Sequence, residues 1–394
     1  MNDILFITKD ALAKEYLPIY GNSYWKNKTP NIDELSKKGT VFTRFYTAAP
    51  STVMSFRTMM MSKFPHEQPF SDYSPKEVME NEEDFFSYAK RMGFESHIIW
   101  DSSWNHMVLR YGNCYGKETK IHSLNNIKQG VGCHYNHKDA LIIDDKKSAK
   151  ALSIIIDEIK AILSPNKKCF VWIHLPHVIN GRICYGGDID LFDELIGLLR
   201  HYFDDDNIFI SADHGNMNGH EGKFCYGFDL NTSSIEIPLL TPRISGLSVC
   251  SDYVSNVDIK KIIFDRTIAK REFIFSDTAY YAQPKRKIAI INNSGLVYIY
   301  DKFKKTEYLF DRENDRFEDV NLLVNTYKDK DRGLKSNIKE YYYSPYWNKI
   351  DEIYSNFKKQ MTSVWKKAPL IIEIRNKLIY CAKKIVIKFR KKKK

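Results

Sequence analysis

Short apolar runs alternate with amphipathic segments over residues 3–212, and this alternation limits the fold more than any other feature. An apolar run bounded by turn-forming residues is typical of a strand that is buried on both faces of a sheet. Strands that alternate with helices predict an α/β fold, in which helices cover both faces of a central, mainly parallel β-sheet. The expected strands are residues 3–8, 94–100, 169–175 and 207–212, and the expected helices are residues 29–39, 55–62, 147–163 and 188–203.

Four further apolar runs between residues 271 and 310 follow one another with short turns and no long helix between them. This spacing predicts a small C-terminal antiparallel sheet packed on the first domain. A chain of 394 residues with 43% hydrophobic content is long enough to bury one large core or two smaller ones. We therefore expect an α/β domain with the candidate site at residues 1–265, an antiparallel subdomain of the same fold at 266–325, and a helical extension at 326–394.

The positive charge is concentrated at the C-terminus. Residues 369–394 contain ten Lys and Arg against one acid, and so hold +9 of the net charge of +11. Because the rest of the chain is close to neutral, the charge does not indicate a nucleic-acid partner. Apolar residues recur in this tail at helical spacing, at Ile371, Ile374, Leu378, Ala382, Ile385 and Phe389. The pattern predicts a C-terminal amphipathic helix that binds an anionic membrane surface. The alternative is a helix whose apolar stripe packs on the domain.

The cysteines and the N-terminus indicate the compartment. Seven cysteines are scattered singly, with no Cys-x-x-Cys pair, as is typical of a protein in a reducing environment. The first expected strand begins at Asp3, which leaves no room for a signal peptide, and no apolar run reaches about 18 residues. We expect a cytoplasmic protein that binds the inner face of the membrane peripherally through its tail.

Polar side chains that can bind metals follow several expected strands. They are Asp10, Asp101, His174, His177, Asp213 and His214. Because function in parallel α/β sheets gathers beyond the carboxyl ends of the strands, we expect these side chains to converge. Carboxylates and an imidazole together suit a divalent cation, so Asp10, Asp213 and His214 are candidate ligands for one ion of Mn, Mg, Ca or Zn. The alternative at Asp213 is a polar loop with a capping Asp.

A first strand "ILFITKD" is followed, in order, by "TPNIDELSKKGTVFTRFYTAAPSTVMSFRTMMMSKFP", "VWIHLPH", "YGGDIDLFDELIGLL", "NIFISADHGNMNGHEGK", "IEIPLL" and "YLFDRENDRFEDVNL". This order resembles the sulfatase-like branch of the alkaline phosphatase superfamily, over residues 3–322. The resemblance implies an alkaline-phosphatase-like fold and a metal-dependent enzyme that acts on phosphate or sulfate esters.

The segment that corresponds to the family's nucleophile departs from the sulfatase pattern. Sulfatases convert a Cys or Ser in Cys/Ser-x-Pro-x-Arg to formylglycine, whereas here Val53 stands four residues before Arg57. None of the seven cysteines is followed by x-Pro-x-Arg, which disfavours a formylglycine mechanism. The pair Thr52-x-x-Ser55 is similar to the Thr nucleophile and helix start of phosphoethanolamine and glycerol-phosphate transferases in the same superfamily. Asp10 is followed by Ala11, so only one acid remains there, as in those transferases.

Thr52 is therefore the candidate nucleophile and a fourth candidate metal ligand. A neutral hydroxyl is a poor nucleophile, and a cation held by Asp10, Asp213 and His214 would stabilise its alkoxide. The free N–H groups of a helix N-terminus would add stabilisation for an anionic ester. Ser51 is the substitute nucleophile, and the alternative is that these hydroxyls only cap the helix.

Further candidates surround this group. Arg57, His177 and His220 are predicted to be catalytic with Thr52, because Arg57 lies within the same helix and the histidines could protonate a leaving oxygen. Four residues are predicted to bind substrate: Ser55, Trp104, His174 and Lys223. For each, an ordinary structural role is the alternative. The expected function is hydrolysis or transfer of phosphate esters, with cell-surface glycan or lipid precursors as targets. The alternatives are a sulfatase that lacks formylglycine and a catalytically inactive binding module.

Overall fold

The structure is a computed structural model of the chain. It describes residues 2–21, 29–68, 83–102, 119–125, 134–135, 141–142, 145–163, 166–176, 185–217, 226–278, 286–324, 326–328, 335–337 and 344–364. Among these residues, no helix combines the length and the apolar composition that crossing a bilayer requires.

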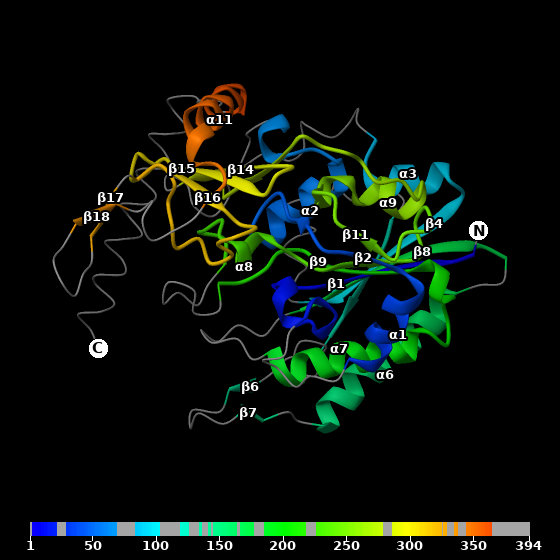
Figure 1. Ribbon diagram of the computed structural model, residues 1–394. Helices are drawn as coiled ribbons and strands as arrows, with labels where there is room; N and C mark the ends of the chain where they lie inside the picture. The colour runs from blue at the N-terminus through cyan, green and yellow to red at the C-terminus, as the bar shows by residue number, and fades with distance from the viewer. Residues whose placement is uncertain are drawn as a thin grey trace, which may run out of the picture.

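A central sheet of eight strands runs through the larger part of the molecule (Figure 1). Its innermost strand, β1, pairs in parallel with β8 on one side and with β9 on the other. The exceptions to the parallel arrangement are the pairings of β10 with β9 and β2. In spatial order the strands are β11 (Val249–Cys250), β2 (Thr40–Phe42), β10 (Leu239–Thr241), β9 (Ile208–Ala212), β1 (Ile4–Lys9), β8 (Lys168–Leu175), β4 (Phe94–Asp101) and β5 (Lys120–Leu124).

The sequence of β1 explains its central place. All six residues of Ile4–Lys9 are buried, as expected for a strand with a neighbour on each edge and helices on each face. Phe6 packs against Trp172 of β8, with the ring centroids 5.2 Å apart, inside the largest hydrophobic cluster. A rigid, buried strand of this kind fixes the position of the residue that follows it, which is Asp10.

Helices cover both faces of the central sheet (Figure 1). One layer, below the sheet in this view, contains α1 (Pro30–Lys38), α6 (Asp145–Ile162) and α7 (Tyr185–Leu199), with α7 in contact with the other two. The other layer contains α2 (Thr52–Met61), α3 (Phe85–Arg91) and α9 (Ile259–Phe264). The predicted α/β architecture is thereby confirmed.

Helix α1 has the boundaries that its sequence predicts. Pro30 occupies the first turn, and the Asp193 carboxylate of α7 accepts hydrogen bonds from the backbone N–H groups of Asn31 and Ile32, at 3.2 and 2.8 Å. At the other end, a Cβ on Gly39 would lie 2.2 Å from the carbonyl oxygen of Thr241, so the close approach to β10 requires glycine.

A second sheet of four antiparallel strands follows, as predicted. It contains β13 (Phe273–Asp277), β14 (Lys287–Asn292), β15 (Leu296–Asp301) and β16 (Thr306–Asp311), with α11 (Ile350–Val364) packed against β14. Phe357 and Met361 of α11 join the apolar cluster of this sheet. The predicted amphipathic tail, residues 369–394, lies outside the described residues.

Short elements complete the described chain. They are β3 (Phe45–Tyr46), β6 (His134–Tyr135), β7 (Leu141–Ile142), β12 (Val254–Ser255), β17 (Thr326–Lys328), β18 (Lys335–Asn337), α8 (Thr232–Ile235), and 3-10 turns that include η7 (Asn256–Asp258). The pairing of β17 with β18 adds a hairpin to the extension for which the sequence predicted helix.

A chain of polar contacts joins β4, β5 and α6 at the edge of the central sheet. His97 Nδ1 lies 2.9 Å from His122 Nε2, His97 Nε2 lies 3.1 Å from Glu95 Oε1, and His122 Nδ1 lies 2.5 Å from Glu158 Oε1. Burial, followed by the neighbouring His122, lowers the pKa of His97 from 6.5 to about 4.

We expect the stability of the protein to fall as the pH drops from 6.5 to 4. In this window the unfolded chain protonates His97 and the folded chain does not, so stability rises with pH. The contribution is on the order of 2 kcal/mol. His97→Gln should flatten the pH dependence of the free energy of unfolding, measured with urea. An unchanged pH dependence in this variant would contradict the assignment.

Candidate metal centre and active site

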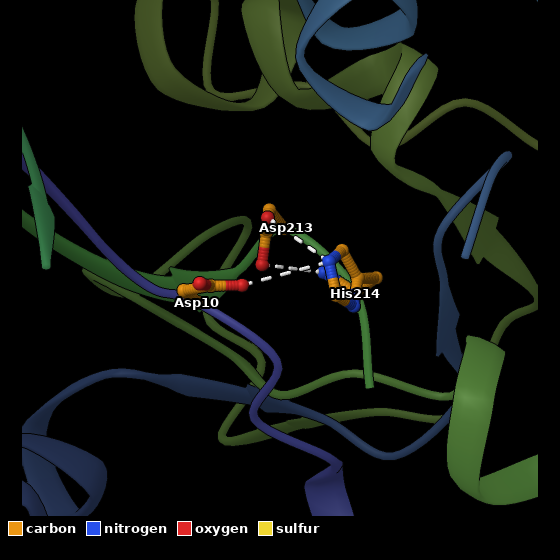
Figure 2. Close-up of side chains that lie close together, drawn as sticks. All are labelled: Asp10, Asp213 and His214. Atoms are coloured by element: carbon orange, nitrogen blue, oxygen red, sulfur yellow. Dashed lines mark hydrogen bonds and ion pairs between the residues drawn. The ribbon is translucent and has the colours of Figure 1, made fainter. Parts of the chain in front are cut away.

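Strands β1 and β9 deliver three candidate ligands to one point at the carboxyl edge of the central sheet (Figure 2). Asp10 follows β1, and Asp213 and His214 follow β9. Ligand atoms of the three residues lie within 4.8 Å of one another, and all three side chains are buried. His214 Nε2 lies 3.5 Å from both Asp10 Oδ1 and Asp213 Oδ2. The predicted convergence of these residues is therefore present in the structure.

Two backbone N–H groups hold Oδ1 of Asp213 in place and leave Oδ2 facing His214. Oδ1 accepts hydrogen bonds from the N–H groups of Ala11, at 3.1 Å, and His214, at 2.8 Å. Ala11 takes the left-handed conformation, with φ of 57°, which is uncommon for a residue with a side chain. Among the described residues, Oδ2 has no hydrogen-bond partner and lies 3.5 Å from His214 Nε2, and burial raises the pKa of Asp213 to about 6. A cation beside Oδ2 would offset this cost of burying charge, so the site fits a metal ion.

The surroundings of His214 set its tautomer. Its Nδ1 lies 2.8 Å from the carbonyl oxygen of Gly215, so Nδ1 carries the ring proton and donates it there. Nε2 therefore turns its lone pair toward the two carboxylates, as a metal ligand requires. Tyr226 stacks on the imidazole, with the ring centroids 4.7 Å apart and the planes 28° apart.

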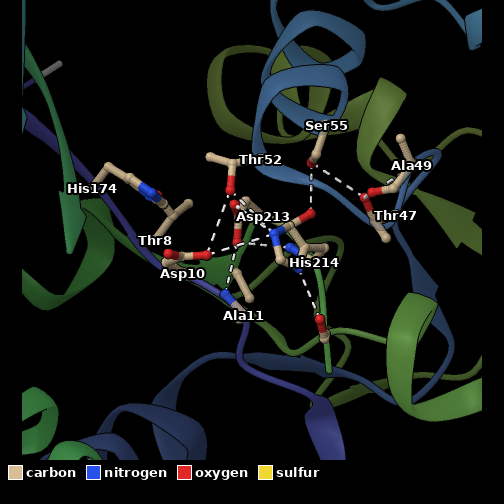
Figure 3. A network of polar contacts seen from close by, with 12 residues as sticks. Thr8, Asp10, Ala11, Thr47, Ala49, Thr52, Ser55, His174, Asp213 and His214 are labelled. Atoms are coloured by element: carbon tan, nitrogen blue, oxygen red, sulfur yellow. Dashed lines mark hydrogen bonds and ion pairs between the residues drawn. The ribbon is translucent and has the colours of Figure 1, made fainter. Parts of the chain in front are cut away.

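Thr52 lies at the same centre. It is the first residue of α2, and its Oγ1 is 3.1 Å from His214 Nε2 and 3.5 Å from Asp10 Oδ1 (Figure 3). Ser51 occupies the cap position but makes no side-chain capping hydrogen bond. The hydroxyl of Thr52 thus faces the candidate ligands from the N-terminus of a buried helix, where backbone N–H groups favour an anion.

Two of the predicted substrate-binding residues lie inside the protein. Ser55 has no exposed surface, and its hydroxyl donates to the carbonyl oxygen of Asp213 at 2.6 Å. His174 is 1% exposed, and its Nδ1 lies 2.9 Å from Thr8 Oγ1. Burial lowers the pKa of His174 well below its usual value, so the ring is neutral. Ser55 and His174 therefore contact protein groups next to the candidate ligands, as residues with a structural role do.

Arg57 lies five residues after Thr52 on α2. The residue is 7% exposed, and its Nε and Nη2 atoms are buried and have no hydrogen-bond partner in the described part of the chain. A buried guanidinium with unsatisfied donors is costly and is suited to binding an anion. Of the other predicted site residues, Trp104, His177, His220 and Lys223 lie outside the described residues.

Two residues that the structure brings to this site, Tyr226 and Asn256, were not predicted from the sequence. Tyr226 packs on His214, and Asn256 bonds to Ser55 from a segment 201 residues away along the chain. Neither residue belongs to a recognisable local motif, because many proteins have an aromatic residue after a polar segment or an Asn after a short strand. Only the three-dimensional structure places them.

The chain is similar to known proteins in part of its sequence and in its fold. Residues 2–178 match the family model described as Sulfatase. No curated protein sequence matches the chain. A putative sulfatase from Bacteroides thetaiotaomicron has a similar structure, with 13% identity, a TM-score of 0.66, and coverage of 92% of each chain. A phosphonate monoester hydrolase of Agrobacterium radiobacter gives 12% identity and a TM-score of 0.63, over 92% of this chain and 95% of that one.

A 2-O GAG sulfatase is also similar, with 13% identity, a TM-score of 0.64, and coverage of 92% of each chain. At these identities the solved structures establish a shared fold. The family match over residues 2–178 and the structural similarity over 92% of the chain give this protein the fold of sulfatases and phosphonate monoester hydrolases.

Proposed function

We propose that this chain is a metal-dependent enzyme that hydrolyses or transfers phosphate esters, with Thr52 as its nucleophile. The observation that carries the proposal is the position of Thr52 Oγ1, 3.1 Å from His214 Nε2 and 3.5 Å from Asp10 Oδ1 at the start of α2. A catalytically inactive binding module would not need a hydroxyl at the centre of a buried cluster of ligands.

The proposed metal ligands are Asp10, Asp213, His214 and Thr52. The first three offer two carboxylates and one imidazole within 4.8 Å of one another, a donor set that suits Mn, Mg, Ca or Zn. When bound, the cation would lower the cost of deprotonating the Thr52 hydroxyl and polarise an oxygen of the ester.

The proposed reaction has two steps. In the first, Thr52 Oγ forms a bond to phosphorus, the bond from phosphorus to the leaving oxygen breaks, and that oxygen takes up a proton. The proton of the Thr52 hydroxyl passes to one of the acceptors around it, for which Asp10 is positioned. In the second, the oxygen of water or of an acceptor hydroxyl bonds to phosphorus, the bond from phosphorus to Thr52 Oγ breaks, and the proton lost by the attacking hydroxyl is balanced by the one that Thr52 Oγ regains. His177 and His220 remain the proposed proton donors to the leaving oxygen.

Arg57 is proposed to bind the nonbridging oxygens of the ester. Its guanidinium is buried on the helix that starts with Thr52, and two of its nitrogens have no hydrogen-bond partner among the residues that the structure describes. An anionic group held there would supply those partners in charge-assisted hydrogen bonds. Lys223 and Trp104 remain predicted substrate contacts, whereas Ser55 and His174 are proposed to support the site through Asp213 and Thr8.

A sulfatase that lacks formylglycine is the second candidate, because the family match is to sulfatases. Val53 argues against formylglycine chemistry, since its side chain carries neither sulfur nor oxygen. Similar structures include both sulfatases and phosphonate monoester hydrolases, so the fold accommodates phosphorus and sulfur esters. Cell-surface glycan or lipid precursors are the proposed targets of the reaction.

Rates on matched aryl esters separate the two candidates. The panel is an aryl phosphate diester, an aryl phosphonate monoester, an aryl phosphate and an aryl sulfate, each tested with Mn²⁺, Mg²⁺, Ca²⁺ and Zn²⁺. We expect a phosphorus ester to be favoured in kcat/KM by about 100-fold or more over the sulfate, a difference of about 3 kcal/mol in transition-state binding. Preference for the sulfate would establish the second candidate and overturn the first.

We also propose that residues 369–394 bind the enzyme to an anionic membrane. This tail carries +9 of the net charge, and each basic residue near such a surface contributes about 1 kcal/mol. Truncation after Lys367 should preserve activity on a small ester but abolish sedimentation with anionic liposomes. Binding of the full chain should weaken with salt. Loss of the thermal unfolding transition on truncation would instead assign the apolar stripe to the core.

A further inference from the structure

Asn256 links the segments that carry the candidate nucleophile and the candidate metal ligands. It begins the short turn η7 and has no exposed surface. The strand just before it, β12, pairs with β3, and the chain runs from β3 toward the N-terminus of α2. The side chain of Asn256 is thus buried beside the entry to α2, where it bonds to Thr47, Ala48 and Ser55.

Three hydrogen bonds orient the amide of Asn256. Its Oδ1 accepts from the backbone N–H of Ala48 at 2.9 Å, which assigns the oxygen. Its Nδ2 donates to Thr47 Oγ1 at 3.1 Å and to Ser55 Oγ at 3.0 Å. A buried amide with this many partners is held in one orientation.

The direction of these bonds decides where the two hydroxyl groups point. Because Nδ2 donates to both hydroxyl oxygens, their hydrogens are directed elsewhere. Ser55 donates to the carbonyl oxygen of Asp213 at 2.6 Å, and Thr47 donates to that of Ala49 at 2.9 Å (Figure 3). The Ser55 bond joins the first turn of α2 to the peptide between Asp213 and His214.

We propose that Asn256 is a positioning residue for this active site. Its hydrogen bonds to the described residues reach Ala48, Thr47 and Ser55. It therefore acts through Ser55, which lies one helical turn after Thr52 and donates to the backbone carbonyl of Asp213. Asn256 thereby sets the position of the nucleophile relative to the metal ligands. The expected effect of Asn256 on turnover rests on the proposed function, whereas its expected effect on metal affinity is independent of that function.

Asn256→Asp tests the direction of the hydrogen bonds at constant shape. A carboxylate still accepts from Ala48, but it only accepts, so the Ser55 hydrogen turns to it and away from the Asp213 carbonyl. We expect kcat on the small ester to fall about 10- to 100-fold, because misplacing a reacting group by a fraction of an ångström to one ångström has effects of this size. KM should change by less than about 3-fold, since binding of the ester is retained.

Two more variants keep the test decisive. Ser55→Ala removes the same link without burying a carboxylate, and should lower kcat to a similar extent. If Asn256 acts through Ser55, the kcat of the variant with both Asn256→Asp and Ser55→Ala should lie within about 3-fold of the kcat of Ser55→Ala alone, as expected for coupled residues. Ser255→Ala is the matched control, because Ser255 is equally buried beside Asn256 and caps η7 without a link to α2. It should keep the wild-type kcat.

Mn²⁺ binding, measured by calorimetry, separates this proposal from the proposed function. Asn256→Asp and Ser55→Ala should each weaken Mn²⁺ binding by about 10-fold, as loss of an outer-shell partner does. If the wild type turns over no ester, the proposed function fails and the Mn²⁺ affinities alone decide the role of Asn256. Folded variants that retain wild-type kcat and Mn²⁺ affinity would overturn the proposal. The proposal would also be overturned if the fold-loss of kcat in the double variant equalled the product of the losses in the two single variants, because the residues would then act independently.

Discussion

Thr52→Ala should abolish turnover while the protein still binds its metal ion. The variant removes the only atom proposed to form a bond to phosphorus, and loss of a nucleophile typically lowers kcat by about 10⁴-fold or more. The two carboxylates and the imidazole of Asp10, Asp213 and His214 remain, and a neutral hydroxyl is a much weaker ligand than these, so Mn²⁺ affinity should change by less than about 10-fold. Initial rates on the best aryl ester and calorimetry with Mn²⁺ measure the two effects separately.

Thr52→Ser is the matched control for this result. It retains a hydroxyl on the first residue of α2 and should recover a substantial part of the activity. Full activity in Thr52→Ala would contradict the assignment and move the role to Ser51, at the cap of the same helix. Ser55 is a poorer substitute, because its hydroxyl is already committed to the carbonyl oxygen of Asp213.

Asp213→Asn should abolish both metal binding and activity without unfolding the protein. The asparagine can keep the oxygen that accepts from Ala11 and His214 but loses the charge at Oδ2. We expect Mn²⁺ affinity to fall by more than about 100-fold, because loss of a direct ligand costs more than loss of an outer-shell partner, which costs about 10- to 100-fold. Because burial raises the pKa of Asp213 to about 6, removing its charge should leave the metal-free protein at least as stable as the wild type.

Thermal unfolding with and without Mn²⁺ checks this second prediction. Mn²⁺ should raise the Tm of the wild type, because the ion binds the folded chain preferentially, and should leave the Tm of Asp213→Asn unchanged. An equal shift in both proteins would exclude Asp213 as a ligand. Asp258→Asn serves as a matched control, since Asp258 is also a buried carboxylate but pairs with Arg271 away from the metal ligands.

The sequence was sufficient to predict the parts of the site that follow buried strands. Apolar runs end directly before Asp10 and Asp213, and parallel strands bring their carboxyl ends to one edge, so proximity follows from the fold. Thr52 could be predicted because hydroxyl residues mark helix starts and because the segment resembles a known nucleophile segment. The antiparallel pairing of β10 was missed, since a strand of three residues gives little periodicity.

The supporting contacts could not be predicted, because they depend on tertiary packing. Spacing places Ser55 one turn after Thr52 on the same helix, but it does not reveal whether that face meets substrate or protein. In the structure Ser55 meets the backbone of Asp213, and His174 meets Thr8. The link from Ser55 to Asn256 spans 201 residues, and no local pattern encodes a contact of that separation.

The central claim is that Thr52 carries the transferred group during turnover. Intact-protein and peptide mass spectrometry after rapid acid quenching of the enzyme with its best phosphate diester tests the claim directly. We predict an adduct equal in mass to the transferred phosphoryl group, located on the peptide that contains Thr52, present in the wild type and absent from Thr52→Ala. Turnover without any protein adduct under single-turnover conditions, or an adduct on Ser51 in the wild type, would contradict the account.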